Sequence, residues 1–298
     1  MEQLLQTIII GLSNGLIYAL VALGYTLVYG ILQLINFAHG DVFMLGSMIA
    51  LTLLMMLGVT PGMDVATTIG LIIVVLVVTM AITAFLNVAI ERVAYRPLRN
   101  APKLAPLISA IGMSFILQNV GLLWKGPANL GFGDVIPNTN ILTTVFGLDT
   151  AVELSFKQLF VGVITIPLLL VLMWFVGSTR QGKAMRATAQ DPDTAGLMGI
   201  DVNRTIAITF VIAGALAGAA GLVQILYNNT TVWNLGFRFG LNAFTSAVLG
   251  GIVLGLINAF SDRYLSAQWT NAIVFGVLIA VLVFRPTGLL GQQLADRA

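Results

Sequence analysis

The sequence contains no cysteine, which excludes disulfide bonds and thiolate metal sites. It has a single histidine, His39, and its carboxylates are scattered, so a dedicated metal site is not expected. Charged residues are also scarce, at 9% of the chain, against roughly 25% in soluble domains. With 58% hydrophobic residues and a mean hydropathy of +0.98, this is the composition of an all-α polytopic membrane protein.

The basic residues do not form one patch. The net charge is +2 and the isoelectric point is near 9.0, but the lysines and arginines stand at the borders of apolar runs, where membrane proteins carry them. Nucleic acid is therefore not an expected partner, and the lipid bilayer is.

About eight apolar runs are long enough to be membrane segments or parts of them, given that a helix needs ~20 residues to cross a bilayer. They are 7–29, 41–58, 69–90, 104–123, 159–176, 205–227, 241–260 and 269–284. We treat 1–298 as a single transmembrane domain made of these helices, some of them broken or re-entrant.

Lysine and arginine counts give the orientation, because cytoplasmic loops are rich in both. Eight of the fourteen basic residues occupy two connections, namely Arg92, Arg96, Arg99 and Lys103 in the first and Arg180, Lys183, Arg186 and Arg204 in the second. Both connections are expected in the cytoplasm. The connection 124–156 has one lysine, Lys125, and 61–68 has no basic residue, so both are expected outside.

The number of membrane crossings along the chain indicates whether the run 241–260 crosses once or is re-entrant. A single crossing there would leave Arg285 and Arg297 outside, whereas a two-limbed or re-entrant segment returns them to the cytoplasm. Glycines at 250, 251 and 255 are placed to break the run. We therefore predict a re-entrant segment, and the same count puts the N-terminus outside.

A polar cluster lies within the apolar sequence at residues 35–41, which read INFAHGD. Ionisable groups inside a membrane are costly and mark functional sites. We expect Gly30, His39 and Gly40 to interrupt a helix here, as broken helices do where they line a cavity. Two roles for His39 stay open: it caps the helix break, or it contacts substrate. Upstream, Asn14 and Tyr18 are four residues apart and share one helical face.

Two features mark the second basic connection. Residues 177–184 resemble a phosphate-binding loop, but a membrane helix precedes them and Ala184 stands where a hydroxyl is needed, so nucleotide binding is not expected. Further on, Asp191 is a good N-cap, Pro192 suits the first helical position and Gly199 suits a left-handed C-terminal position. These signals predict a short helix over 192–198, either a partner-docking element or a connector.

Four stretches carry a family resemblance. They are INFAHGDVFMLGS (35–47), ERVAYRPLRNAPKLAPLISAIGMSFILQN (91–119), GKAMRATAQDPDTAGLMGID (182–201) and VLVFRPTGLLG (281–291). Together they make the chain similar to the LivH-type permease of branched-chain amino acid ABC transporters. The resemblance implies a multi-pass subunit of the inner membrane that pairs with a second related permease, two cytoplasmic ATPases and a periplasmic binding protein. It implies no cofactor in this chain, because ATP is bound by the partner subunits.

The resemblance also assigns roles to residues. It makes 180–201 the cytoplasmic segment that transmits ATPase motion, with five coupling candidates: Arg186, Asp191, Pro192, Gly196 and Gly199. It makes 124–157 a periplasmic loop and, with 228–240, a docking surface for the binding protein. It also places the helix break at 34–46 near the translocation path, so the substrate-pathway candidates are Asn36, His39, Asp41, Asn14 and Tyr18.

The chain departs from the family pattern near residues 242–255. Relatives carry a Gly-rich turn with a proline and then a second helix of small residues, whereas 247–251 here continues directly into 252–255. Either the deletion is genuine and the pore is reshaped, or the sequence omits a stretch, which is the interpretation we favour.

The expected function is therefore the ATP-driven import of hydrophobic amino acids through a passive gate rather than an enzyme. A similar permease for urea or short amides is the alternative, because related permeases share the residue 35–41 pattern. An ion-coupled carrier is less expected, since Asp41 is the only strong membrane-embedded carboxylate. No convergent nucleophile, base or metal set supports an enzyme.

Overall fold

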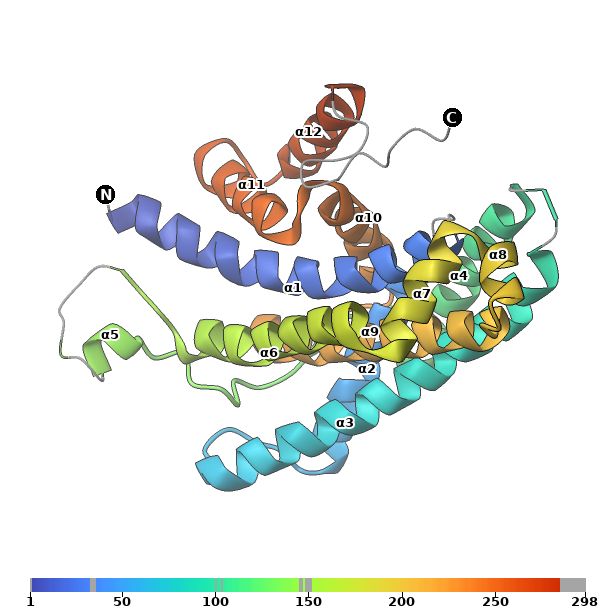
Figure 1. Ribbon diagram of the computed structural model, residues 1–298. Coiled ribbons are helices and arrows are strands. Elements are labelled where there is room, and N and C mark those ends of the chain that lie inside the picture. Colours follow the sequence, from blue (N-terminus) through green and yellow to red (C-terminus); the bar gives the residue numbers. More distant parts are fainter. Residues whose placement is uncertain are drawn as a thin grey trace.

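The computed structural model describes residues 2–32, 36–99, 101–102, 104–144, 147 and 152–284. The predicted positions Lys103, Arg285 and Arg297 and the motif at 285–291 lie outside this part of the chain. Figure 1 shows a bundle of long helices with two short helices at one end and a loop region at the other. The helices are α1 (Glu2–Leu32), α2 (Ala38–Met56), α3 (Val65–Ile90), α4 (Leu104–Lys125), α5 (Ile141–Thr144), α6 (Phe156–Ser178), α7 (Arg180–Gln190), α8 (Pro192–Leu197), α9 (Val202–Asn228), α10 (Leu235–Leu249), α11 (Gly251–Tyr264) and α12 (Thr270–Phe284).

Every predicted apolar run is helical. Among the described residues, six helices (α1, α2, α3, α4, α6 and α9) are long and apolar enough to cross a membrane, and α12 is a shorter apolar helix. The run 241–260 is divided between α10 and α11, which are bent by 119° at Gly250. A polytopic all-α membrane protein with a broken segment is thus confirmed.

Two central helices carry most of the core. In their most apolar windows α2 and α9 are 72% buried, whereas α6 is only 17% and α3 and α4 are 28% buried. The outer helices instead expose large apolar side chains such as Phe85, Leu170 and Trp174, as helices that face lipid do. This places the functional side chains of α2 and α9 at the centre of the bundle.

Close contacts between helices depend on glycines. A Cβ at Gly255 would collide with the backbone of Gly15, and one at Gly251 with Ala19, so α11 lies directly against α1. Likewise Gly214 of α9 approaches the backbone of α3, and Gly221 approaches that of α2. Small residues let helix backbones approach in lipid. The structure thereby identifies which helices pack closely, namely α11 on α1 and α9 on α2 and α3.

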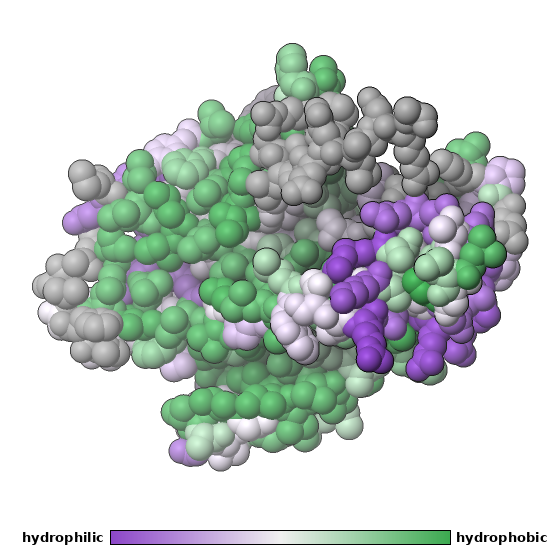
Figure 2. Space-filling view, viewed as in Figure 1, coloured by the Kyte–Doolittle hydropathy of each residue, from purple (hydrophilic) through white to green (hydrophobic). Residues whose placement is uncertain are grey.

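The two ends of the bundle differ in chemistry. Hydrophilic residues gather over the end that carries α7 and α8 (Figure 2). The first basic connection includes a π-helical turn (Glu91–Tyr95) and a 3₁₀ turn (Arg96–Leu98), and it meets the start of α9 where Arg99 donates to Asn203 at 2.5 Å. Both basic connections therefore share one end, as predicted.

The opposite end holds the segment 124–157. Its strand β1 (Leu130–Gly131) pairs antiparallel with β2 (Thr230–Thr231), which follows α9. Asp134 forms an ion pair with Lys157 and accepts a hydrogen bond from Asn229. The start of α1 lies here as well, because the Glu153 N–H donates to the Gln6 side chain at 2.8 Å. By the distribution of basic residues this is the outer end.

The pair α10–α11 starts from and returns to this same end of the bundle. It follows β2, and α11 ends where Asp262 and Arg263 share a cavity with Glu2 at the start of α1. Gly250, with a φ of +91°, makes the sharp turn between the limbs, a backbone conformation that glycine adopts without strain. This geometry agrees with the predicted re-entrant segment.

Two sequence predictions need correction. Gly30 lies inside α1, and His39 and Gly40 lie inside α2, so these residues do not interrupt a helix. The break falls between two separate helices, after Leu32 and before Ala38. The segment 228–240 is also not an outer loop throughout, because α10 begins at Leu235 and buries Gly236 and Gly240 against α2. Gly40, Gly236 and Gly240 let α2 and α10 lie close together. The glycine at position 40 therefore marks a contact between helices and not the helix break that the sequence suggested.

Candidate functional site

The predicted cluster at the start of α2 is fully enclosed. Asn36, His39 and Asp41 are 1%, 0% and 0% exposed. The Asn36 carbonyl accepts the His39 N–H at 3.1 Å, which begins the first turn of α2. The Asn36 side-chain oxygen accepts the Tyr95 hydroxyl at 2.7 Å. The cluster is thereby tied to the π-helical turn that follows α3, and this partner could not be identified from the sequence.

Asp41 is held by a hydrogen-bonded pair on α4. Its Oδ2 accepts the Ser114 hydroxyl at 2.5 Å, and Ser114 in turn accepts from the Gln118 amide at 3.1 Å. Its other oxygen, Oδ1, is buried and has no hydrogen-bond partner among the described residues. Ser114 and Gln118 were not among the predicted site residues. Their spacing of four in an apolar run indicates a polar face on one helix, which could have identified them.

His39 packs rather than caps. Its ring meets the ring of Tyr25 edge-on at 4.8 Å between centroids, and Gly24 of α1 leaves the space that its Nε2 occupies. The ring lies beside the Val21 carbonyl, but neither ring nitrogen reaches hydrogen-bonding geometry with a described residue. The N-cap position, Phe37, has no side-chain cap either. The start of α2 therefore carries no side-chain cap, the His39 ring packs against α1, and the role of His39 in the path stays a prediction.

The start of α10 covers the cluster. A Cβ at Gly236 would collide with Asp41 Oδ1, and a Cβ at Gly40 would collide with the Gly236 carbonyl oxygen. Gly240 packs against Gly40 one turn further along, beside the Tyr25 hydroxyl. The unpartnered oxygen of Asp41 thus faces α10 at Gly236.

Asn14 and Tyr18 lie elsewhere, on a cavity of about 280 Å³ between α1, α9 and α10. Its position beside β2 puts it in the outer half of the bundle, and we call it the outer cavity. No carboxylate, lysine, arginine or histidine lines it, and amides and hydroxyls dominate. Its lining residues are Asn14, Ile17, Tyr18, Gln224, Asn228, Thr230 and Phe239. The predicted common face of Asn14 and Tyr18 is confirmed.

One aromatic side chain separates the outer cavity from the cluster. Phe239 of α10 lines the cavity, and its ring lies 5.4 Å from that of Tyr18 and stacks on Phe43 at 4.9 Å. Phe43 belongs to the same turns of α2 as His39 and Asp41. The five pathway candidates therefore fall into two groups, on either side of Phe239.

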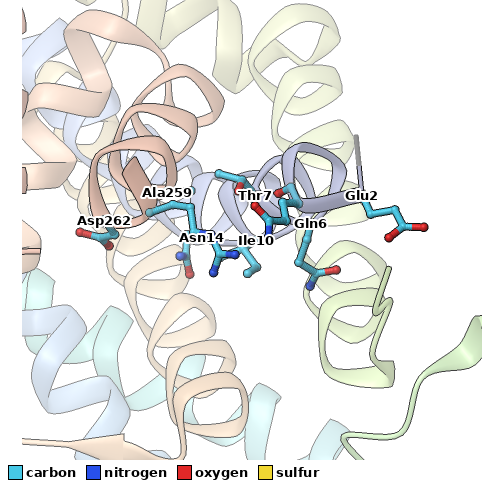
Figure 3. Close-up of a pocket in the computed structure, with 9 residues that line it drawn as sticks. Glu2, Gln6, Thr7, Ile10, Asn14, Ala259 and Asp262 are labelled. Atoms are coloured by element: carbon cyan, nitrogen blue, oxygen red, sulfur yellow. Dashed lines mark hydrogen bonds between the residues drawn. The ribbon is translucent and has the colours of Figure 1, made fainter. Parts of the chain in front are cut away.

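A second cavity of about 440 Å³ opens at the outer end of α1. Figure 3 shows Thr7, Ile10 and Asn14 from α1 and Ala259 and Asp262 from α11 around it. It carries charge, from Glu2, Asp262 and Arg263, unlike the outer cavity. Within the described part of the chain no three His, Asp or Glu side chains stand together as metal ligands.

The coupling candidates lie on α7 and α8 or directly beside α8, at one end of the bundle (Figure 1). Arg186 donates to the carbonyls of Val176 and Gly177, so it ties α7 to the last turn of α6. Asp191 caps α8 by accepting from the N–H groups of Asp193 and Thr194 at 3.0 and 3.2 Å. Arg186 therefore holds α7 against α6, and the Asp191 cap starts α8 directly after α7.

The end of α8 is built as the sequence predicts. Pro192 occupies the first turn, and Gly199 has a φ of +83°. The Gly199 and Ile200 N–H groups donate to the carbonyls of Gly196 and Ala195 at 3.0 and 3.1 Å, which is a Schellman motif.

The tip of α8 is apolar and exposed. Leu197 and Met198 are 89% and 79% exposed at the hydrophilic end of the bundle. Exposed apolar side chains outside the membrane mark contact surfaces. The sequence analysis did not select these two, although an apolar pair in a polar helix was visible.

The chain matches the family described as branched-chain amino acid transport system / permease component over residues 7–293. It is 41% identical to the high-affinity branched-chain amino acid transport system permease protein BraD of Pseudomonas aeruginosa, with 98% of this chain and 97% of the relative covered. It is 37% identical to LivH of Escherichia coli K12 over the same shares. A probable LivH of Methanocaldococcus jannaschii is 30% identical, with 94% and 91% covered.

The alignment with BraD runs over 311 positions, more than the 298 residues of this chain, so that relative has residues without a counterpart here. No solved structure matches the chain significantly. The membrane-length helices, the enclosed polar cluster and the near full-length matches agree, and the chain belongs to the branched-chain amino acid permease family as a multi-pass membrane protein.

Proposed function

We propose that this protein is the membrane-spanning subunit of an ATP-driven importer of branched-chain amino acids in the plasma (inner) membrane. The observation that carries the proposal is the near full-length similarity to permeases named for that transport. The outer cavity supports it, because neutral amides and hydroxyls suit a zwitterion and Ile17 and Phe239 suit an apolar side chain.

We take the partners from those that the family resemblance implies. A second related permease completes the path, two cytoplasmic ATPases supply the motion, and a binding protein delivers the amino acid to the outer end. The apolar tip of α8, formed by Leu197 and Met198, fits a groove on an ATPase subunit. The segment 124–157, with the turn that follows α9, fits the binding protein.

Coupling passes through α7 and α8. ATPase closure moves the tip of α8, and the angle held by Asp191, Pro192, Gly196 and Gly199 passes that motion to α7. Arg186 then transmits it to α6 through the carbonyls at the end of that helix. Asn14, Tyr18, Asn36, His39 and Asp41 lie along the path that this motion opens.

The test is uptake by vesicles that contain the permease pair and its ATPases, with binding protein outside. Labelled leucine is expected to accumulate only with ATP, and labelled urea is the comparison cargo. Accumulation of urea but not leucine would transfer the proposal to the amide permeases. Leucine uptake without ATP, driven by an ion gradient, would overturn the ATP-driven assignment.

A further inference from the structure

We propose that α10 is the gate of the translocation path. In this arrangement Phe239 closes the inner end of the outer cavity, and the free oxygen of Asp41 accepts the ammonium group of the amino acid once α10 withdraws. This inference rests on the proposed function, and it names the moving element and the first charged contact beyond the cavity.

Phe239 lies between the outer cavity and α2. It lines the outer cavity, yet its ring is stacked on Phe43 at 4.9 Å and lies 5.4 Å from Tyr18. No other aromatic ring in the described residues joins the cavity lining to α2 in this way. A molecule in the cavity therefore cannot reach the region of Asp41 until this ring moves.

One carboxylate oxygen of Asp41 has no partner among the described residues. Asp41 is 0% exposed, and its Oδ1 has no hydrogen-bond partner among the described residues while Oδ2 is bound by Ser114. A buried acceptor without a partner is costly. It is covered by Gly236, on the same helix as Phe239 and one turn before it.

These two features belong to one rigid element. Withdrawal of α10 moves Phe239 out of the cavity floor and Gly236 off Asp41 in the same step. The helix is suited to move, because its N-cap has no side-chain hydrogen bond and Gly250 at its other end has a φ of +91°. Its contact with Gly40 through Gly236 and Gly240 has no interlocking side chains to separate.

The chemistry fits an α-amino acid. The outer cavity offers neutral polar groups, so it holds a zwitterion without selecting a charge, whereas Asp41 offers a negative oxygen to a primary ammonium group. Urea has no ammonium group, so its passage would not use Asp41.

The gate is tested with the whole assembly in vesicles loaded with labelled leucine, without ATP or binding protein. Phe239→Ala is expected to raise the leak of leucine about tenfold, because it removes two aromatic contacts and the barrier that they form. The matched control is Phe237→Ala on the same helix, whose side chain is 55% exposed and faces away from the cavity lining. Its leak should stay at the level of the unaltered protein.

A tight membrane in Phe239→Ala, with normal ATP-driven uptake, would overturn the gate. If Phe239→Ala does not reach the membrane, Phe239→Leu is measured with the same two outcomes, since it keeps bulk and removes ring stacking. Failure of the proposed function is a separate result, because the unaltered assembly would then take up no leucine with ATP.

The role of Asp41 is tested in the leaking Phe239→Ala variant. Asp41→Asn added to Phe239→Ala keeps an acceptor for Ser114 but removes the charge. The leucine leak is expected to fall severalfold, while the leak of labelled urea through the same path is unchanged. Equal loss of both leaks would show that Asp41 only supports the fold, and no loss of either would remove it from the path.

Discussion

At the scale of single residues, the polar cluster depends on glycines that the cluster motif itself does not include. His39 fits against α1 because Gly24 has no side chain, and Asp41 fits under α10 because of Gly236. The sequence predicts that the cluster is important from its cost in lipid. It cannot identify Tyr95 and Ser114 as partners, because they lie 59 and 73 residues from Asn36 and Asp41.

Gly24→Ala tests this dependence. The new Cβ would collide with the ring of His39, which is fully buried and has no free space to move into. We expect destabilisation by about 1–3 kcal/mol, as for other overpacked cores. The measurement is the thermal unfolding midpoint and membrane abundance of the assembled protein.

The control for that substitution lies on the same helix. Gly30→Ala meets no atom within 4 Å, so the better helix propensity of alanine makes it neutral or stabilising by up to about 1 kcal/mol. Equal stability of the two variants would show that the ring of His39 is not tightly held by α1.

A second residue-scale prediction concerns acid pH at the outer end. The hydrogen bond from Lys157, and then that from Asn229, hold the pKa of Asp134 below its usual value. The ionised form therefore stabilises the fold above the unfolded pKa of about 3.9, and this contribution is lost as pH falls through the lowered pKa. The effect is small, because Asp134 is 59% exposed.

Asp134→Asn is the matching variant. At pH 7 it should be slightly less stable than the unaltered protein. The difference should shrink as the pH falls from about 4 through the lowered pKa, below which the unaltered carboxylate is protonated too. Thermal unfolding across this pH range measures it. A difference that is constant with pH would mean that the charge of Asp134 plays no part.

At the scale of elements, local chemistry predicts α8 better than any membrane helix boundary. Asp191, Pro192 and Gly199 each occupy the position that capping rules assign them, and the helix ends within one residue of the expected limit. The break near residues 30–40 was misplaced for the opposite reason. Gly30 and Gly40 look like helix breakers locally, but both lie inside helices, and Gly40 serves the close contact between α2 and α10.

Gly199→Pro is the sharpest test of α8 as a coupling element. Proline fixes φ near −65° and has no N–H, so it cannot take the φ of +83° or donate to Gly196. The amount of leucine taken up per ATP hydrolysed should fall by about tenfold, a factor within the usual range of coupling between two sites. Membrane insertion should be unchanged, because this turn lies outside the apolar segments.

Gly199→Asn is its control, since asparagine tolerates a left-handed backbone and keeps the N–H. It should retain most of the coupling. If Gly199→Pro transports with normal ATP use, α8 is a connector and the alternative left open by the sequence is the correct one.

At the scale of the whole molecule, the connecting segments divide between the two ends of the bundle. The start of α1, the segment 124–157 and the end of α11 share one end of the bundle, and both basic connections share the other. Residue counts predicted this division because charge near membrane borders is a property of sequence alone. The depth of α10 was not predictable, because it depends on the contact of Gly236 with a helix nearly 200 positions earlier in the chain.

The re-entrant path of α10–α11 predicts the side on which the turn before α12 lies. Ser266 stands in that turn, after α11 and before Thr270. The chain has no cysteine of its own, so Ser266→Cys in an assembly with cysteine-free partners carries a single reporter thiol. A membrane-impermeant thiol reagent added outside intact cells should label it, and Asp193→Cys on α8 should be labelled only after the membrane is opened. If α10 and α11 instead formed one crossing, Ser266→Cys would share the protection of Asp193→Cys. The turn at Gly250 would then be a kink in a spanning helix, and α10 could not withdraw from Asp41 towards the outer side.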